Sequence, residues 1–115
     1  MSYNLNQMAT EATGLLAAGD HFDGASHDTS AWAYVRFRVL AASDQAGTVY
    51  IEQSADGTTW FRTSTEPVTA GFTQAAIVTE SLITMRYVRA YYVNGATQQT
   101  EFMLATALLA FAETA

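Results

Sequence analysis

The sequence predicts an all-β domain, an antiparallel β-sandwich or jelly roll of about eight strands with a short N-terminal arm. Wet and dry side chains alternate from Gly47 to Gln53, which is the period-two pattern of a strand with one buried face. The dipeptides Asp56-Gly57 and Asn94-Gly95 are typical of tight hairpin turns. Turn-forming residues recur about every 8 to 12 residues, and no convincing long helix is indicated.

The chain of 115 residues has the size of one domain. We expect an arm over residues 1–12, the sandwich over residues 13–110 and a tail over residues 111–115. The absence of cysteine excludes disulfides, thiolate metal sites and a cysteine nucleophile.

The net charge of -6 comes from eleven acidic residues against five arginines. This balance argues against a nucleic-acid partner, because phosphate binding needs clustered positive charge. Only 14% of the residues are charged, so part of the surface is expected to face protein instead of water. The N-terminus lacks the basic start and apolar run of a secretory signal. No apolar stretch approaches the ~20 residues of a membrane span, so no membrane association is expected.

The first third of the chain predicts one short strand and one loop. Thr13 to Ala18 is an apolar run that predicts the first strand. Asp20 to Ser30 is dense in Asp, Gly and Ser and is expected to be a loop. His21 and His27 lie in it beside aspartates and could bind a divalent ion, but no third His or Cys completes a site. A solvated, turn-forming loop without metal is the favoured interpretation.

Ala31 to Ala42 predicts a long strand with two different faces. The better core face consists of Ala33, Val35, Phe37 and Val39. The opposite face is expected to be solvated or to meet a partner, and it consists of Trp32, Tyr34, Arg36, Arg38 and Leu40.

After the Asp56-Gly57 turn, Thr58 to Phe61 are expected to resume as a strand, and Pro67 is expected to begin an edge strand or a corner. Two short strands follow at Val68 to Ala70 and at Phe72 to Thr79. The second long strand, Thr84 to Asn94, is expected to alternate between a core set and an outward set. The core set is Val88, Ala90 and Tyr92, and the outward set is Tyr87, Arg89 and Tyr91.

The last segment, Gln98 to Ala110, is expected to be a strand with Phe102 and Leu104 inward. A helix from Phe102 to Ala112 competes with it, because Ala, Leu and Met are good helix formers. The preceding turn signal and two threonines favour the strand.

Nucleophilic catalysis needs a serine or threonine beside a histidine and an orienting acid. Ser26, His27 and Asp28 supply these residue types, but consecutive residues cannot adopt the required geometry. Glu52 and Glu101 are expected on outward faces, where cross-strand ion pairs with arginine are their favoured role. We therefore expect no enzyme activity, no catalytic residue and no cofactor.

The spacing S-x-D-G-x-T-W from Ser54 to Trp60 is similar to the Asp-box hairpin of sialidase-type propellers. In that motif the aspartate ties the turn to backbone amides and the tryptophan packs beneath. A propeller needs several copies and this chain has one, so the resemblance supports a hairpin with a structural Asp56.

A second resemblance rests on the order of the motifs. Ser43 to Trp60 (SDQAGTVYIEQSADGTTW) and Met85 to Leu108 (MRYVRAYYVNGATQQTEFMLATAL) resemble a recurrent β-sandwich module of tailed-bacteriophage structural proteins. The resemblance covers about residues 13–110, and small stand-alone members look like head decoration or cementing proteins. It implies a protein made in the bacterial cytoplasm and located on the capsid surface of the virion. The implied partners are the major capsid protein and, by analogy, further copies in a homo-oligomer such as a trimer.

For such a protein we expect the contacts to come from the arm and from two outward stripes. The candidate contact residues are Tyr3, Leu5, Met8, Trp32, Tyr34, Arg36, Arg38, Arg89 and Tyr91. The alternative is a carbohydrate-binding or receptor-binding module of a phage tail or bacterial surface protein. Its sugar-stacking platform would draw on the outward aromatic residues Trp32, Tyr34, Tyr87 and Tyr91.

Overall fold

The computed structural model describes residues 9–30, 34–72 and 77–110, which form β-strands and no helix. The predicted all-β fold class is confirmed. No helix in this part of the chain is long and apolar enough to cross a membrane. The strands are β1 (Ala9–Ala12), β2 (His21–Asp23), β3 (His27–Asp28), β4 (Tyr34–Ser43), β5 (Gly47–Ser54), β6 (Phe61–Val68), β7 (Ile77–Leu82), β8 (Tyr87–Asn94) and β9 (Phe102–Ala110).

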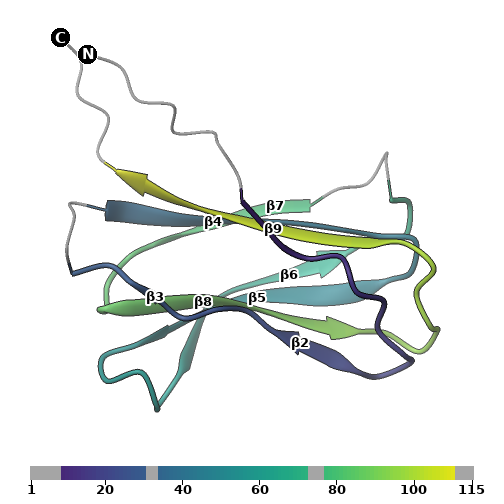
Figure 1. Cartoon of the computed structure of the whole chain (residues 1–115), viewed down its shortest axis with the longest axis horizontal. Coiled ribbons are helices and arrows are strands. Elements are labelled where there is room, and N and C mark those ends of the chain that lie inside the picture. Colours follow the sequence, from purple (N-terminus) through teal and green to yellow (C-terminus); the bar gives the residue numbers. More distant parts are fainter. Residues whose placement is uncertain (1–8, 31–33, 73–76, 111–115) are drawn as a thin grey trace, which may run out of the picture.

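The strands form two antiparallel sheets that face each other as the layers of a sandwich (Figure 1). The four-stranded sheet has the order β1-β9-β4-β7, and the five-stranded sheet has the order β2-β8-β5-β6 with β3 also paired to β8. Only β5 and β6 are consecutive strands that pair with each other among the described residues. The connections after β4, β6, β7 and β8 all cross from one sheet to the other, as in Greek-key sandwiches.

The core lies between the sheets and follows the alternation of the long strands. Each fully buried aliphatic or aromatic side chain contributes roughly 1.5–3 kcal/mol to stability. The expected core positions Val88, Ala90 and Tyr92 are confirmed, as are Phe37 and Val39. Val35 is only partly buried, and Ala33 lies outside the described residues. The core cluster consists of Phe37, Val39, Ala41, Val49, Ile51, Val68, Val88, Ala90, Tyr92, Phe102 and Leu104.

The hairpin between β5 and β6 contains Asp56 and Gly57 in its connection, as predicted. The expectation that the strand resumes at Thr58 was wrong, because β6 begins at Phe61. Gly57 has a φ of 82°, a conformation that side chains with a Cβ rarely adopt. The Asp56 carboxylate accepts the amides of Thr59 at 3.0 Å and Thr58 at 2.9 Å. These hydrogen bonds, led by the one from Thr59, lower the pKa of Asp56 below its usual range. The structural role expected for this aspartate is thus present in the turn.

The prediction of a first strand over Thr13 to Ala18 was wrong. This segment is irregular, and buried amide side chains take the place of strand partners. The Leu16 amide donates to Gln99 Oε1 at 2.9 Å, and the Leu16 carbonyl accepts the Gln99 amide at 3.1 Å. The first strand of the described chain is β1, which pairs with β9 and falls within the segment expected to be an arm.

The prediction of a tight hairpin at Asn94 and Gly95 was also wrong, because β8 and β9 belong to different sheets. The Asn94 side chain is buried and donates to three carbonyls, those of Leu16, Ala17 and Thr97. The Asn94 side chain therefore connects the crossover from β8 to β9 with the irregular segment that precedes β2.

Smaller differences concern two short strands that were not expected and the ends of strands that were. The expected loop from Asp20 to Ser30 contains β2 and β3, which pair with β8. Pro67 lies in the edge strand β6, so its edge position is confirmed, but it is the next-to-last residue of that strand and does not begin it. Val68, expected to begin the next strand, is the last residue of β6. Of the strand expected over Phe72 to Thr79, the part from Ile77 onward lies in β7, which continues to Leu82. Phe72 lies in a turn, and residues 73–76 lie outside the described part. The last segment is the strand β9 and not the competing helix.

Gly47→Ala tests the close approach of β5 to β8. A Cβ at Gly47 would lie 2.2 Å from the hydroxyl oxygen of Tyr92, whose ring packs against Phe102 in the core. We expect the substitution to lower the free energy of unfolding by about 1–3 kcal/mol, measured by chemical denaturation. Gly14→Ala is the control, because nothing lies within 4 Å of a Cβ there. Equal stability of the two variants would contradict the packing described.

The hydrogen bonds of Asp44 should make the free energy of unfolding sensitive to acid, because they hold the turn before β9. Hydrogen bonds from the Thr100 hydroxyl and from the amides of Glu101 and Thr100 lower the pKa of Asp44 to about 2. The stabilisation is fully present above the unfolded-state pKa of about 3.9 and is lost as the pH falls toward 2. Asp44→Asn should therefore flatten the fall in unfolding free energy between about pH 4 and pH 2. A wild-type slope in the variant would show that this turn does not depend on the carboxylate.

Candidate functional site on the outer face of the five-stranded sheet

The outer face of the five-stranded sheet collects aromatic and charged side chains from β5 and β8. Tyr50 lies opposite Tyr91 and Glu52 lies opposite Arg89 in the antiparallel register. The prediction that Arg89 and Tyr91 point outward while Ala90 lies in the core is confirmed. We call this surface the aromatic–arginine face, and it consists of His21, Tyr50, Glu52, Trp60, Arg62, Tyr87, Arg89 and Tyr91.

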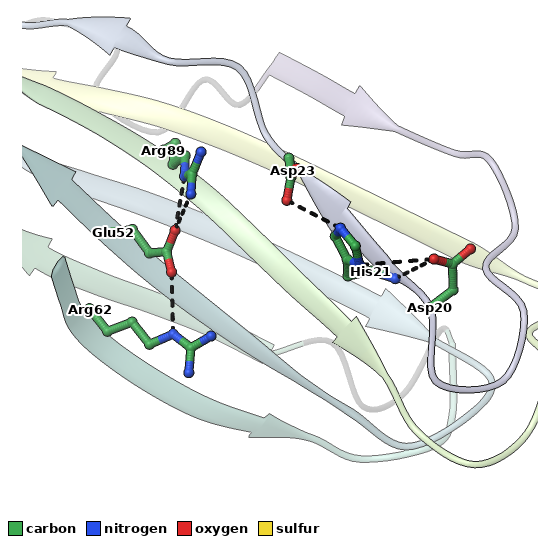
Figure 2. Close-up of polar contacts among 6 residues, drawn as sticks. All are labelled: Asp20, His21, Asp23, Glu52, Arg62 and Arg89. Carbon is green, nitrogen blue, oxygen red and sulfur yellow. Dashed lines mark hydrogen bonds and ion pairs between the residues drawn. The ribbon is translucent and has the colours of Figure 1, made fainter. Parts of the chain in front are cut away.

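Glu52 lies at the centre of this face and is only 6% exposed. Its Oε1 accepts Arg89 Nη2 at 2.8 Å and Nε at 2.9 Å, and its Oε2 accepts Arg62 Nε at 3.2 Å (Figure 2). Arg62 reaches the carboxylate because a bulge between Ile51 and Glu52 shifts the register of β6. The predicted cross-strand ion pairing of Glu52 is confirmed. Two guanidinium groups share one carboxylate, so the cluster carries one excess positive charge.

The aromatic rings of the face are covered by cationic or imidazole side chains. The Arg62 guanidinium lies 3.9 Å from the Tyr50 ring centroid, and that of Arg89 lies 4.2 Å from Trp60. The His21 ring stacks on Tyr91, with 5.5 Å between centroids and 27° between planes. These contacts rigidify the face and occupy ring surfaces that a sugar would need for stacking.

The two ends of the face differ in charge. At the β2 edge, His21 lies between Asp20 and Asp23, with Nδ1 4.0 Å and Nε2 3.8 Å from the nearest carboxylate oxygens (Figure 2). All three side chains are about half exposed. No group of three or more His, Cys, Asp or Glu is placed to hold a metal ion in the described part of the chain. The face thus has an acidic end at β2 and a cationic end at β6.

The second histidine lies on the inner side of the same sheet. His27 Nε2 is 2.7 Å from Glu11 Oε2, and the hydroxyl of Thr106 donates to the same oxygen. Burial raises the pKa of Glu11, but the hydrogen bonds outweigh it and hold the pKa below its usual range. His27 is therefore not brought together with His21. Asp28, the next residue along the chain, pairs with Arg86 at 2.9 Å instead of orienting His27.

The structure separates the expected contact residues onto opposite surfaces. Arg36 and Arg38 lie on the outer face of the four-stranded sheet, where both approach Glu80 of β7. Arg89 and Tyr91 lie on the aromatic–arginine face, so one flat partner cannot contact both pairs. Tyr34 is half-buried at the start of β4. The remaining expected contacts, Tyr3, Leu5, Met8 and Trp32, lie outside the described residues.

Sequence reasoning missed most of the aromatic–arginine face. Tyr50 could have been found, because it shares the wet face of the alternating strand with Glu52. Arg62 could not, because the bulge in the β5–β6 pairing sets which β6 residue meets Glu52. Trp60 lies in the connection before β6 and joins the face through its contact with Arg89. His21 falls in a segment for which the sequence predicts a loop, and only the pairing of β2 with β8 places its ring against Tyr91.

Comparisons with known proteins identify a family to which the chain is similar, a curated relative and a solved structure. A family model described as "Uncharacterised protein YqxG N-terminal domain" matches residues 1–109. The "Phage-like element PBSX protein XepA" of Bacillus subtilis (strain 168) is 37% identical over 73 residues, covering 64% of this chain and 23% of that protein. The solved structure described as "Crystal structure of PBSX exported protein XepA" is similar with a TM-score of 0.86 and 27% identity. That match covers 95% of this chain and 39% of the other. The chain therefore spans well under half the length of these relatives.

Glu52→Gln tests whether the carboxylate holds the face together. The substitution keeps the size of the side chain but leaves two guanidinium groups without their shared anion. We expect a loss of about 1.5–3 kcal/mol in unfolding free energy, because the substitution removes the charge from hydrogen bonds that the carboxylate accepts from two guanidinium groups. Arg62→Gln removes a half-exposed partner and should cost less than about 1 kcal/mol. Similar losses in both variants, measured by denaturation, would contradict a central role for Glu52.

Proposed function

The chain belongs to the family of the YqxG N-terminal domain, and from this membership we propose that it is a phage-derived structural protein that binds another protein. The named relative comes from a phage-like element and is described as exported. These descriptions support a phage-derived origin and a structural or exported role. The match covers 23% of the curated relative and 39% of the chain in the solved structure.

The observation that carries the proposal is the aromatic–arginine face. Tyr, Trp and Arg are the residue types enriched at the energetic centres of protein interfaces. Here they are fixed in place by Glu52 and by mutual stacking before any partner binds. Side chains that are already ordered lose little conformational freedom on binding, which favours affinity.

The finer proposal is a decoration or cementing protein that binds the major capsid protein and stabilises the head. Such a protein needs a compact fold and a surface that can lie on a lattice of other proteins. The sandwich and its low content of charged residues suit this role. In this proposal the protein is located on the capsid surface of the virion, as a homo-oligomer.

A carbohydrate-binding or receptor-binding module is the second candidate. It is favoured by the presence of aromatic rings beside carboxylates and guanidinium groups on one open sheet face. It is disfavoured because Arg62, Arg89 and His21 already cover ring surfaces of that face. Oligosaccharides should therefore leave the fluorescence of the protein unchanged.

Co-sedimentation with expanded capsids of the corresponding phage or phage-like element tests the decoration proposal. Wild-type protein should bind to saturation, and Arg62→Gln should lower the occupancy by about tenfold if the aromatic–arginine face makes the contact. Arg36→Gln is matched in charge and exposure, with 48% of the side chain exposed against 51% for Arg62, but it lies on the opposite face. We expect this variant to bind like wild type.

A loss confined to Arg36→Gln would move the contact to the four-stranded sheet. Failure of the wild-type protein to sediment with capsids would overturn the decoration role.

A further inference from the structure

We propose that the aromatic–arginine face receives a carboxylate from an acidic segment of the protein partner, and that Arg62 binds this carboxylate. The inference rests on the proposed protein-binding function and names the chemistry of its contact. Three features of the face lead to it: an excess positive charge, unused donors and an acidic opposite end.

The first feature is the charge balance around Glu52. Arg62 and Arg89 carry two positive charges and Glu52 carries one negative charge, although the chain as a whole has a net charge of -6. The carboxylate is buried beneath both guanidinium groups, so it neutralises half of their charge and leaves the outer side cationic. An anion that approaches from outside meets a local charge of opposite sign.

The second feature is the set of donors that Arg62 leaves unused. Its Nε donates to Glu52, whereas its two Nη groups make no hydrogen bond with the described residues. Arg86, in contrast, directs both Nε and Nη2 to the carboxylate of Asp28. The Arg62 guanidinium lies over Tyr50 and within 5.6 Å of the Tyr91 ring centroid, with half of the side chain exposed. It therefore presents a fixed edge to a carboxylate.

The third feature selects a protein segment over an acidic polysaccharide. Asp20 and Asp23 lie at the β2 edge of the sheet, and Arg62 lies in β6 at the other edge (Figure 2). A polymer with a charge on every repeat would place negative charge against these aspartates. In a peptide, the acidic residues can be confined to one end. That end would lie at Arg62 and away from the two aspartates, so the charges of the face would set the direction in which the peptide binds.

Heteronuclear NMR of the full chain provides the test, with the arginine Nε–H signals as reporters. The probe is a blocked peptide of two glutamates followed by four serines, and its matched control has glutamines in place of the glutamates. We expect the acidic peptide to shift the Arg62 signal and the amides of β5 and β8, and the glutamine peptide to leave them unchanged. Arg62→Gln should weaken binding about tenfold, and Arg36→Gln by less than about twofold.

Oligogalacturonate and maltohexaose are the carbohydrate arms of the same titration. A stronger response to oligogalacturonate than to the acidic peptide would overturn the choice of a protein segment. Absence of a shift at Arg62 with the peptide, or equal weakening by both arginine variants, would overturn the site. If the peptide test fails but the protein still binds capsids, the proposed function holds and the carboxylate site is wrong. If the peptide binds at Arg62 but the protein does not bind capsids, the carboxylate site holds and the proposed function is wrong.

Discussion

The alternation of side chains along β5 is the constraint on which both the fold and the face depend. Gln53 points inward and is fully buried, where its amide group donates to the Leu82 carbonyl at 2.7 Å and accepts the Thr84 amide at 2.8 Å. It thereby joins the five-stranded sheet to the crossover after β7. Glu52 points outward and gathers two arginines. A slip of one residue would exchange these two side chains, place an unpaired carboxylate between the sheets and separate the arginines from their anion.

The order of neighbouring residues in the sequence predicted those parts of the fold that depend on interactions between neighbouring residues. The alternation of the long strands, the Asp56-Gly57 turn and the edge position of Pro67 all follow from neighbouring residues. Asn94 and Gln99 show where this reasoning ends, because their side chains bind the segment around Leu16 from the far end of the sequence. Because of these hydrogen bonds, Asn94-Gly95 forms no hairpin and Thr13 to Ala18 forms no strand. The local sequence of either segment gives no indication of such long-range contacts.

The same distinction holds for the candidate site. The outward direction of Arg89 and the pairing of Glu52 could be predicted from alternation and charge. The composition of the face could not, because Arg62 arrives through a bulge and His21 through a short strand paired with β8. The division of the expected contacts between two surfaces likewise depends on which sheet each strand joins. The four-stranded sheet presents the exposed apolar side chains Val78 and Leu82, so the two outer surfaces differ in chemistry.

Hydroxyl-radical footprinting of the free and particle-bound protein tests the central claim most directly, because it measures the solvent accessibility of individual side chains. If the aromatic–arginine face is the contact surface, Tyr50 and Tyr91 should become protected on binding while Val78 and Leu82 remain reactive. Protection of Val78 and Leu82 with unchanged reactivity of the two tyrosines would contradict the account and would assign the contact to the four-stranded sheet.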